Sequence, residues 1–239
     1  MSGLQSIPRV TIWVTVAAFC VFNADAVLAQ TPFGPSPYLQ FSDSPFSSID
    51  FSSGYFHLED FEDEELNTPG VTDSQGEVIG PDFQTDSVDA DDGMIDGLGQ
   101  LGHSWYLGDG ELLEFFFDGS ALGGLLPTHV GIVWTDVGFV QGEAFGFADV
   151  SFEAFDAGDN SLGVIGPDLL GDGSVEGGTA EDRFFGMFSS GGIARIAITT
   201  DNSSDWEIDH LQYGFVPEPA SVVLVAIGTA WLARKRRGR

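Results

Sequence analysis

Residues 206–214 are Trp206-Glu207-Ile208-Asp209-His210-Leu211-Gln212-Tyr213-Gly214, and this stretch indicates the fold class. Apolar and acidic side chains alternate along its first half, which is typical of a β-strand with one face on a core and the other toward solvent. A second stretch, Ile193-Ala194-Arg195-Ile196-Ala197-Ile198, has a mixed pattern that suits a strand packed on both faces. Both stretches predict β-structure rather than helix.

Similar short runs, rich in aromatic and β-branched residues, recur through residues 30–215 between clusters of Gly, Asp, Asn and Pro, and no convincing amphipathic helix appears among them. Besides Ile193–Thr199 and Trp206–Tyr213, we expect strands over Tyr55–Phe61, Leu112–Phe117, Val130–Trp134, Val150–Phe155 and Arg183–Phe188. Seven or more strands joined by long Gly- and Asp-rich loops predict an all-β domain, a jelly-roll or lectin-like two-sheet β-sandwich.

The element Ile208-Asp209-His210-Leu211 is similar to the last strand of jelly-roll carbohydrate-binding modules, which often carry an Ile-Asp-x-Leu pattern. The likeness covers the nine residues from Trp206 to Gly214. It implies a jelly roll, whereas sugar binding has to be argued from a site.

The charge is strongly one-sided, with 37 acidic residues against 8 basic ones. Within residues 30–215 the only basic side chains apart from histidine are Arg183 and Arg195. Such a surface repels phosphate, so nucleic acid is excluded as a partner. The carboxylates need counterions, which makes Ca²⁺ or a saline habitat the natural expectation. The 21 Phe residues indicate that the domain nevertheless folds.

The densest carboxylate group lies in Asp86-Ser87-Val88-Asp89-Ala90-Asp91-Asp92-Gly93-Met94-Ile95-Asp96-Gly97. Its spacing does not match an EF-hand, so a calcium site here rests on oxygen density and on the turn glycines alone. The candidate ligands are Asp86, Asp89, Asp91, Asp92 and Asp96. The alternative is a solvated acidic turn.

Residues 1–29 have the features of a signal peptide. A short polar start with Arg9 precedes the apolar run Val10–Phe22, and Val27-Leu28-Ala29 offers a small-residue cleavage site before Gln30. The only cysteine, Cys20, lies in this leader, so the mature chain is expected to contain no intramolecular disulfide. The acidic all-β ectodomain then spans residues 30–215.

Residues 216–239 contain three features in order: Pro217-Glu218-Pro219, the apolar run Val222–Ala233 and the basic run Arg234-Lys235-Arg236-Arg237. This tail resembles the PEP-CTERM sorting signal. The resemblance implies that an exosortase-like enzyme recognises Pro217, Glu218 and Pro219, and that the run Val222–Ala233 forms a single membrane helix with the basic stop on the cytoplasmic side. It also implies an exported protein, with an inner-membrane intermediate and then a place at the cell surface or in an exopolysaccharide matrix. The alternative is a permanent tail anchor.

The sequence contains no catalytic motif: it has no Gly-x-Ser-x-Gly elbow, no P-loop and no zinc-protease spacing of its scattered histidines. Sugars stack on exposed aromatic rings, and the pair Trp105 and Tyr106 is the first candidate for glycan stacking, although large rings usually fill a core. We therefore expect a non-enzymatic polysaccharide-binding or structural protein. The alternative is an extracellular polysaccharide hydrolase or lyase.

Overall fold

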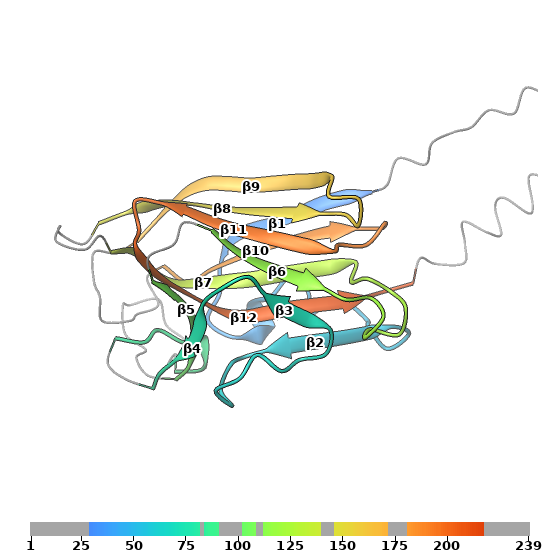
Figure 1. The fold of residues 1–239 in the computed structure, drawn as a ribbon, viewed down its shortest axis with the longest axis horizontal. Coiled ribbons are helices and arrows are strands. Elements are labelled where there is room, and N and C mark those ends of the chain that lie inside the picture. The colour runs from blue at the N-terminus through green and yellow to red at the C-terminus, as the bar shows by residue number, and fades with distance from the viewer. Residues whose placement is uncertain are drawn as a thin grey trace, which may run out of the picture.

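The computed structural model describes residues 29–81, 84–90, 102–108, 112–139, 146–171 and 181–217, which form a two-sheet antiparallel β-sandwich (Figure 1). The seven-stranded sheet has the order β1 (Gln30–Pro37), β10 (Arg183–Ser189), β7 (His129–Phe139), β12 (Asp205–Phe215), β5 (Ser104–Gly108) and β4 (Glu77–Ile79), with β2 (Tyr55–Glu59) also paired to β12. The five-stranded sheet has the order β3 (Val71–Asp73), β6 (Leu112–Phe117), β11 (Arg195–Asp201), β8 (Ala148–Phe155) and β9 (Ser161–Leu170).

The expected all-β two-sheet sandwich is confirmed, and each of the seven predicted strands overlaps an observed one. The helical elements among the described residues are two short 3-10 turns, η1 (Phe41–Asp43) and η2 (Val88–Ala90). None of them has the length or hydrophobicity that a membrane span requires. The jelly-roll or lectin-like connectivity stays a prediction, and residues 1–28 of the predicted signal peptide and the predicted tail helix lie outside the described residues.

The core lies between the sheets and depends on the alternation along β12. Trp206 and Ile208 point inward and pack with Trp134 of β7, whose ring centroid lies 5.0 Å from that of Trp206. At His210, where φ is 46°, the pairing with β7 shifts register, as at a β-bulge. The bulge resets the alternation, so that Leu211 and Tyr213 also face the core.

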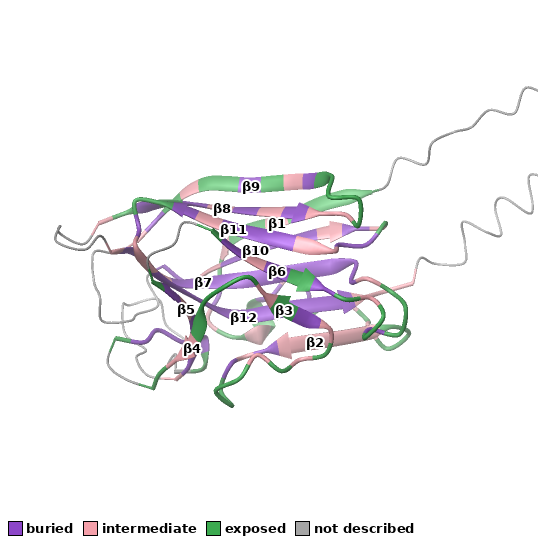
Figure 2. Ribbon diagram, in the orientation of Figure 1, coloured by how far each residue is buried: buried purple, intermediate pink, exposed green. Residues whose placement is uncertain are grey.

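The expectation of a half-solvated face at Trp206–Asp209 is wrong, because a second layer covers the outer face of the seven-stranded sheet. In that layer Tyr38, Phe46 and Val88 form an apolar cluster with Val133 of β7 and Phe184 of β10. As a result β7 and β12 are buried along most of their length, and Glu207 and Asp209 are only 4% and 0% exposed (Figure 2). The sequence pattern could not show this cover, since its residues come from segments distant from β12.

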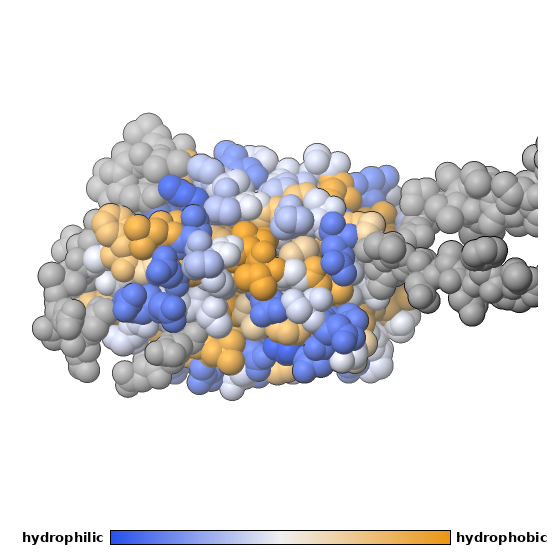
Figure 3. All heavy atoms as spheres, turned by 90° about the horizontal axis from the view of Figure 1, so that it is seen from above, coloured by the Kyte–Doolittle hydropathy of each residue, from blue (hydrophilic) through white to orange (hydrophobic). Residues whose placement is uncertain are grey.

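The two ends of the sandwich differ. β1 begins and β12 ends at one end, whereas β4 and the start of β12 lie at the other (Figure 1). The outer surface mixes hydrophilic and hydrophobic side chains (Figure 3), and exposed Val164 and Leu169 belong to the edge strand β9. Both arginines of the domain are engaged: Arg195 pairs with Glu114 and Asp159 over the ring of Phe155, and Arg183 donates to the carbonyl of Asp182.

Candidate functional site

A row of polar side chains crosses the seven-stranded sheet at the end remote from the described termini. Glu77 of β4 pairs with Tyr106 of β5, Tyr106 pairs with Glu207 of β12, and Glu207 pairs with Asp136 of β7. Directly paired residues on neighbouring antiparallel strands point to the same face of a sheet. The Tyr106 row, defined by these four residues, therefore brings one aromatic ring and three carboxyl groups together on one face.

Tyr106 also lines two hollows in the surface. One, of about 220 Å³, is lined by Tyr106 and Phe139, by Gln84 and by the carboxyl groups of Asp136, Asp205 and Glu207. The other, of about 310 Å³, is lined by Gln75, Gly76, Glu77, Tyr106, Leu107 and Gly108. Rings beside several hydrogen-bonding groups are the combination that fixes a polar organic ligand such as a sugar.

The two members of the predicted aromatic pair lie on opposite faces of β5. Trp105 is 5% exposed and packs in the core between Phe61 and Phe115, so it is not available for stacking. This corrects the expectation for Trp105, and the physical reason is strand alternation. Tyr106 is half-buried on the outer side, with its hydroxyl end over Gly108, where a Cβ atom would come within 2.8 Å of the Tyr106 hydroxyl.

Glu207 links the row to the segment 84–90. Its Oε2 atom accepts hydrogen bonds from the Ser104 hydroxyl at 2.5 Å and from the Asp86 backbone N–H at 3.0 Å. Burial raises the pKa of Glu207 to about 8, although both hydrogen bonds oppose this shift. Burial of Glu207 therefore favours its protonated form.

A second group of polar side chains lies where segment 84–90 meets the bulge of β12. Asp89, Asp209 and His210 each offer one ligand atom, and these atoms lie within 4.8 Å of one another. His210 Nε2 is 3.1 Å from Asp89 Oδ2, and Asp209 Oδ2 accepts hydrogen bonds from Ser87 Oγ at 3.1 Å and the Val88 N–H at 3.0 Å. We call these three residues the Asp-His group. The group can bind a metal ion, or its two carboxylates can stabilise a protonated His210 imidazole.

The electrostatics of the Asp-His group follow from burial. Burial raises the pKa of Asp209 to about 7. Burial would lower the pKa of His210, but the carboxylates of Asp209 and Asp89 outweigh it and raise that pKa. The opposite ring atom, His210 Nδ1, lies 2.8 Å from the Tyr38 hydroxyl, which in turn accepts a hydrogen bond from Gln212 Nε2 at 2.9 Å. A buried polar chain thus fixes the ring orientation.

Only part of the predicted calcium loop can be placed. Asp86 is buried and Asp89 is exposed in the Asp-His group, whereas Asp91, Asp92 and Asp96 lie outside the described residues. Calcium itself stays a prediction. Sequence reasoning missed Asp209 and His210 as partners of Asp89, because they are 120 residues or more away in the chain and an isolated Asp-His pair has no ligand spacing of its own.

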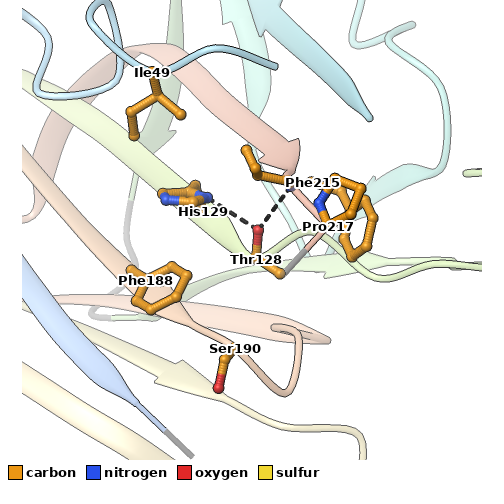
Figure 4. Close-up of a pocket in the computed structure, with 8 residues that line it drawn as sticks. Ile49, Thr128, His129, Phe188, Ser190, Phe215 and Pro217 are labelled. Atoms are coloured by element: carbon orange, nitrogen blue, oxygen red, sulfur yellow. Dashed lines mark hydrogen bonds between the residues drawn. The ribbon is translucent and has the colours of Figure 1, made fainter. Parts of the chain in front are cut away.

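A third candidate is the apolar pocket of about 450 Å³ drawn in Figure 4, which is lined in part by Val216 and Pro217 at the C-terminal end of the described residues. Its walls include Ile49, Phe188, Phe215 and Pro217, with His129 between them. Pro217, the first residue of the predicted sorting motif, is therefore part of the wall of this pocket. Glu218, Pro219 and the basic stop from Arg234 lie outside the described residues.

His129 supplies a pH test of this pocket. Its ring packs against Phe46, Phe51 and Phe188, and burial lowers its pKa from 6.5 to about 4. The stability that His129 contributes is fully present above pH 6.5 and is lost as the pH falls towards 4, because the unfolded chain takes up the proton first. We expect His129→Phe to lose less unfolding free energy between pH 7 and pH 4.5 than wild type, measured by urea unfolding. Equal losses would contradict the assignment.

Comparison with known proteins gives no family assignment. No family model matches the chain, and no curated protein matches it. Among solved structures the chain is similar to the CBM22-1 xylan-binding domain of Paenibacillus barcinonensis Xyn10C, with 15% sequence identity and a TM-score of 0.23, over 66% of this chain and 96% of that domain. Similarity this weak does not extend xylan binding to this chain.

Proposed function

We propose that the domain is a non-enzymatic module that binds a neutral polysaccharide along the Tyr106 row. The observation that carries this proposal is the position of Tyr106, a half-buried ring that lines two hollows and has carboxyl groups on paired strands to either side. The apolar face of a pyranose packs against such a ring, and the sugar hydroxyls donate hydrogen bonds to carboxylate oxygens.

The charge of the row selects the class of polysaccharide. Glu77, Asp136, Asp205 and Glu207 line the two hollows, which contain no Lys or Arg among the described lining residues. A uronate or sulfated chain would bring further negative charge to this surface and would be repelled. Neutral chains such as glucans, mannans and xylans carry only hydroxyl donors and acceptors, so they fit the row.

Affinity gel electrophoresis of the full chain in mild detergent tests the proposal. We expect at least one neutral polysaccharide in the gel to retard the protein, while alginate and polygalacturonate do not. Replacing Tyr106 by Ala should weaken retardation about fivefold or more, as loss of one stacked ring costs on the order of 1 kcal/mol. Phe116→Ala, on the outer face of the other sheet, is the matched control and should behave as wild type. Retardation unaffected by Tyr106→Ala would rule out this site.

A second function, hydrolysis of a polysaccharide, is favoured by one observation. Glu207 has a raised pKa and lies beside Asp136 and Asp205, which resembles the acid and base pair that glycosidases use. Binding is better supported, because Glu207 Oε2 is already held by Ser104 and Asp86. Release of reducing ends that is lost in Glu207→Gln would establish the hydrolase, whereas retardation without release supports the binding module.

We also propose that the protein is exported and sorted to the cell surface or extracellular matrix. The support is the sequence alone: the leader before Gln30 and the ordered motif, apolar run and basic stop of residues 217–237. An exosortase-like enzyme is the processing partner that this order implies. Deleting residues 234–239 removes the basic stop. The protein should then lack its membrane intermediate, which cell fractionation would detect.

A further inference from the structure

The Asp-His group combines two carboxylates with one imidazole, and this donor set narrows the choice of ion. Calcium takes oxygen ligands, whereas Zn²⁺ and Mn²⁺ accept imidazole nitrogen together with carboxylate oxygen. In a tetrahedral zinc site the ligand atoms lie about 3.3 Å apart, as bond lengths near 2.0–2.1 Å require. His210 Nε2 and Asp89 Oδ2 are 3.1 Å apart, so a small outward movement accommodates the ion.

An independent observation concerns the far side of the imidazole. A histidine that binds a metal usually has its other ring nitrogen fixed by a hydrogen-bonding partner. His210 has this arrangement, since Nδ1 contacts the buried Tyr38 hydroxyl, and the Gln212 side chain continues from Tyr38 to Ser44 Oγ at 2.6 Å. His210 is 3% exposed, and its Nε2 atom lies 3.1 Å from Asp89 Oδ2.

We propose that the Asp-His group binds one transition-metal ion of the Zn²⁺ class, and that this ion fixes segment 84–90 to β12. Asp209 and His210 belong to β12, whereas Asp89 comes from the segment. An ion shared by the three side chains ties the two parts of the chain together at the exposed end of segment 84–90. The carboxylates then neutralise the ion in a region where neither arginine of the domain is available.

The ion would also regulate the Tyr106 row, and this step rests on the proposed function. Gln84 lines the smaller hollow, and the Asp86 N–H is bonded to Glu207 of the row. Between them and the Asp-His group, Ser87 and Val88 donate to Asp209. Fixing Asp89 therefore holds one wall of the hollow, and we expect glycan affinity to fall when the ion is removed.

Isothermal titration of the full chain in detergent, first treated with chelator and dialysed, tests the site itself. We expect one Zn²⁺ per chain, with Ca²⁺ bound at least tenfold more weakly, and Co²⁺ should give the visible absorption of a low-coordinate site with a nitrogen ligand. Asp89→Asn, at an exposed position, should weaken Zn²⁺ binding at least tenfold. Asp149→Asn, an exposed carboxylate on β8, is the control and should bind as wild type.

Three results would overturn the site: no Zn²⁺ uptake by wild type, equal affinities for Ca²⁺ and Zn²⁺, or unchanged uptake by Asp89→Asn. Gel retardation by the neutral polysaccharide, with chelator and then with Zn²⁺, tests the coupling separately. If the protein takes up Zn²⁺ but glycan retardation is the same with chelator and with Zn²⁺, the coupling is wrong and both binding sites remain supported. Zn²⁺ uptake without any glycan retardation would overturn the proposed function and leave the metal site in place.

Discussion

Replacing Trp206 by alanine is expected to lower the free energy of unfolding by about 3–5 kcal/mol, the usual cost of removing a large buried ring. Trp206 is 1% exposed and packs against Trp134. Removal of its side chain therefore leaves a cavity that the two sheets cannot close. For a domain of this size the melting temperature should fall by roughly 6–20 °C. Thermal unfolding followed by circular dichroism measures the change.

Leu169→Ala is the matched control for Trp206→Ala. Leu169 is 61% exposed on the edge strand β9, so its loss should cost less than about 1 kcal/mol. A Trp206→Ala protein that melts within a degree or two of Leu169→Ala would contradict the placement of Trp206 in the core.

Replacing Asp209 by alanine is expected to lower the free energy of unfolding by about 3–5 kcal/mol. This is the usual cost of removing one partner of a buried charge pair. Asp209 is fully buried and accepts hydrogen bonds from Ser87 Oγ and from the backbone N–H groups of Val88 and His210. Alanine leaves the backbone N–H groups of Val88 and His210 without this acceptor and removes the carboxylate charge beside the His210 imidazole. Urea unfolding in the presence of chelator measures the loss without a contribution from any ion.

Hydrogen exchange localises the effect of the Asp209 substitution. The Val88 amide should lose protection in Asp209→Ala, and Asp209→Asn should lose less, because the amide oxygen can still accept one hydrogen bond. Unchanged protection at Val88 in Asp209→Ala would show that Asp209 does not hold segment 84–90 on β12.

The strands were predictable where side chains alternate and the run is long. Leu112–Phe117 is predicted and observed with the same bounds, and β7 extends the predicted Val130–Trp134 at both ends. The expected runs did not include β1, which contains Pro32, Pro35 and Pro37, or β9, which contains three glycine or proline residues. Proline and glycine weaken a strand pattern, so edge strands of this kind need tertiary pairing to be recognised.

The candidate site was predictable only at single positions. Tyr106 and Asp89 were identified from their residue types, but Glu207, Asp136 and Asp209 come from strands β12 and β7, and only the sheet pairing brings them to those positions. The bulge at His210 could not be foreseen either, since the alternation of Trp206 and Ile208 gives no sign of a change of phase at Leu211.

The most direct test of polysaccharide binding at the Tyr106 row is saturation-transfer NMR with a soluble neutral oligosaccharide and the full chain in deuterated detergent. With saturation of the aromatic protons, we expect the strongest transfer to the axial C–H protons on one face of a sugar ring, because that face packs on Tyr106. Tyr106→Phe should keep this pattern and Tyr106→Ala should abolish it. Transfer of the same pattern and strength in Tyr106→Ala would place the glycan elsewhere and contradict the account.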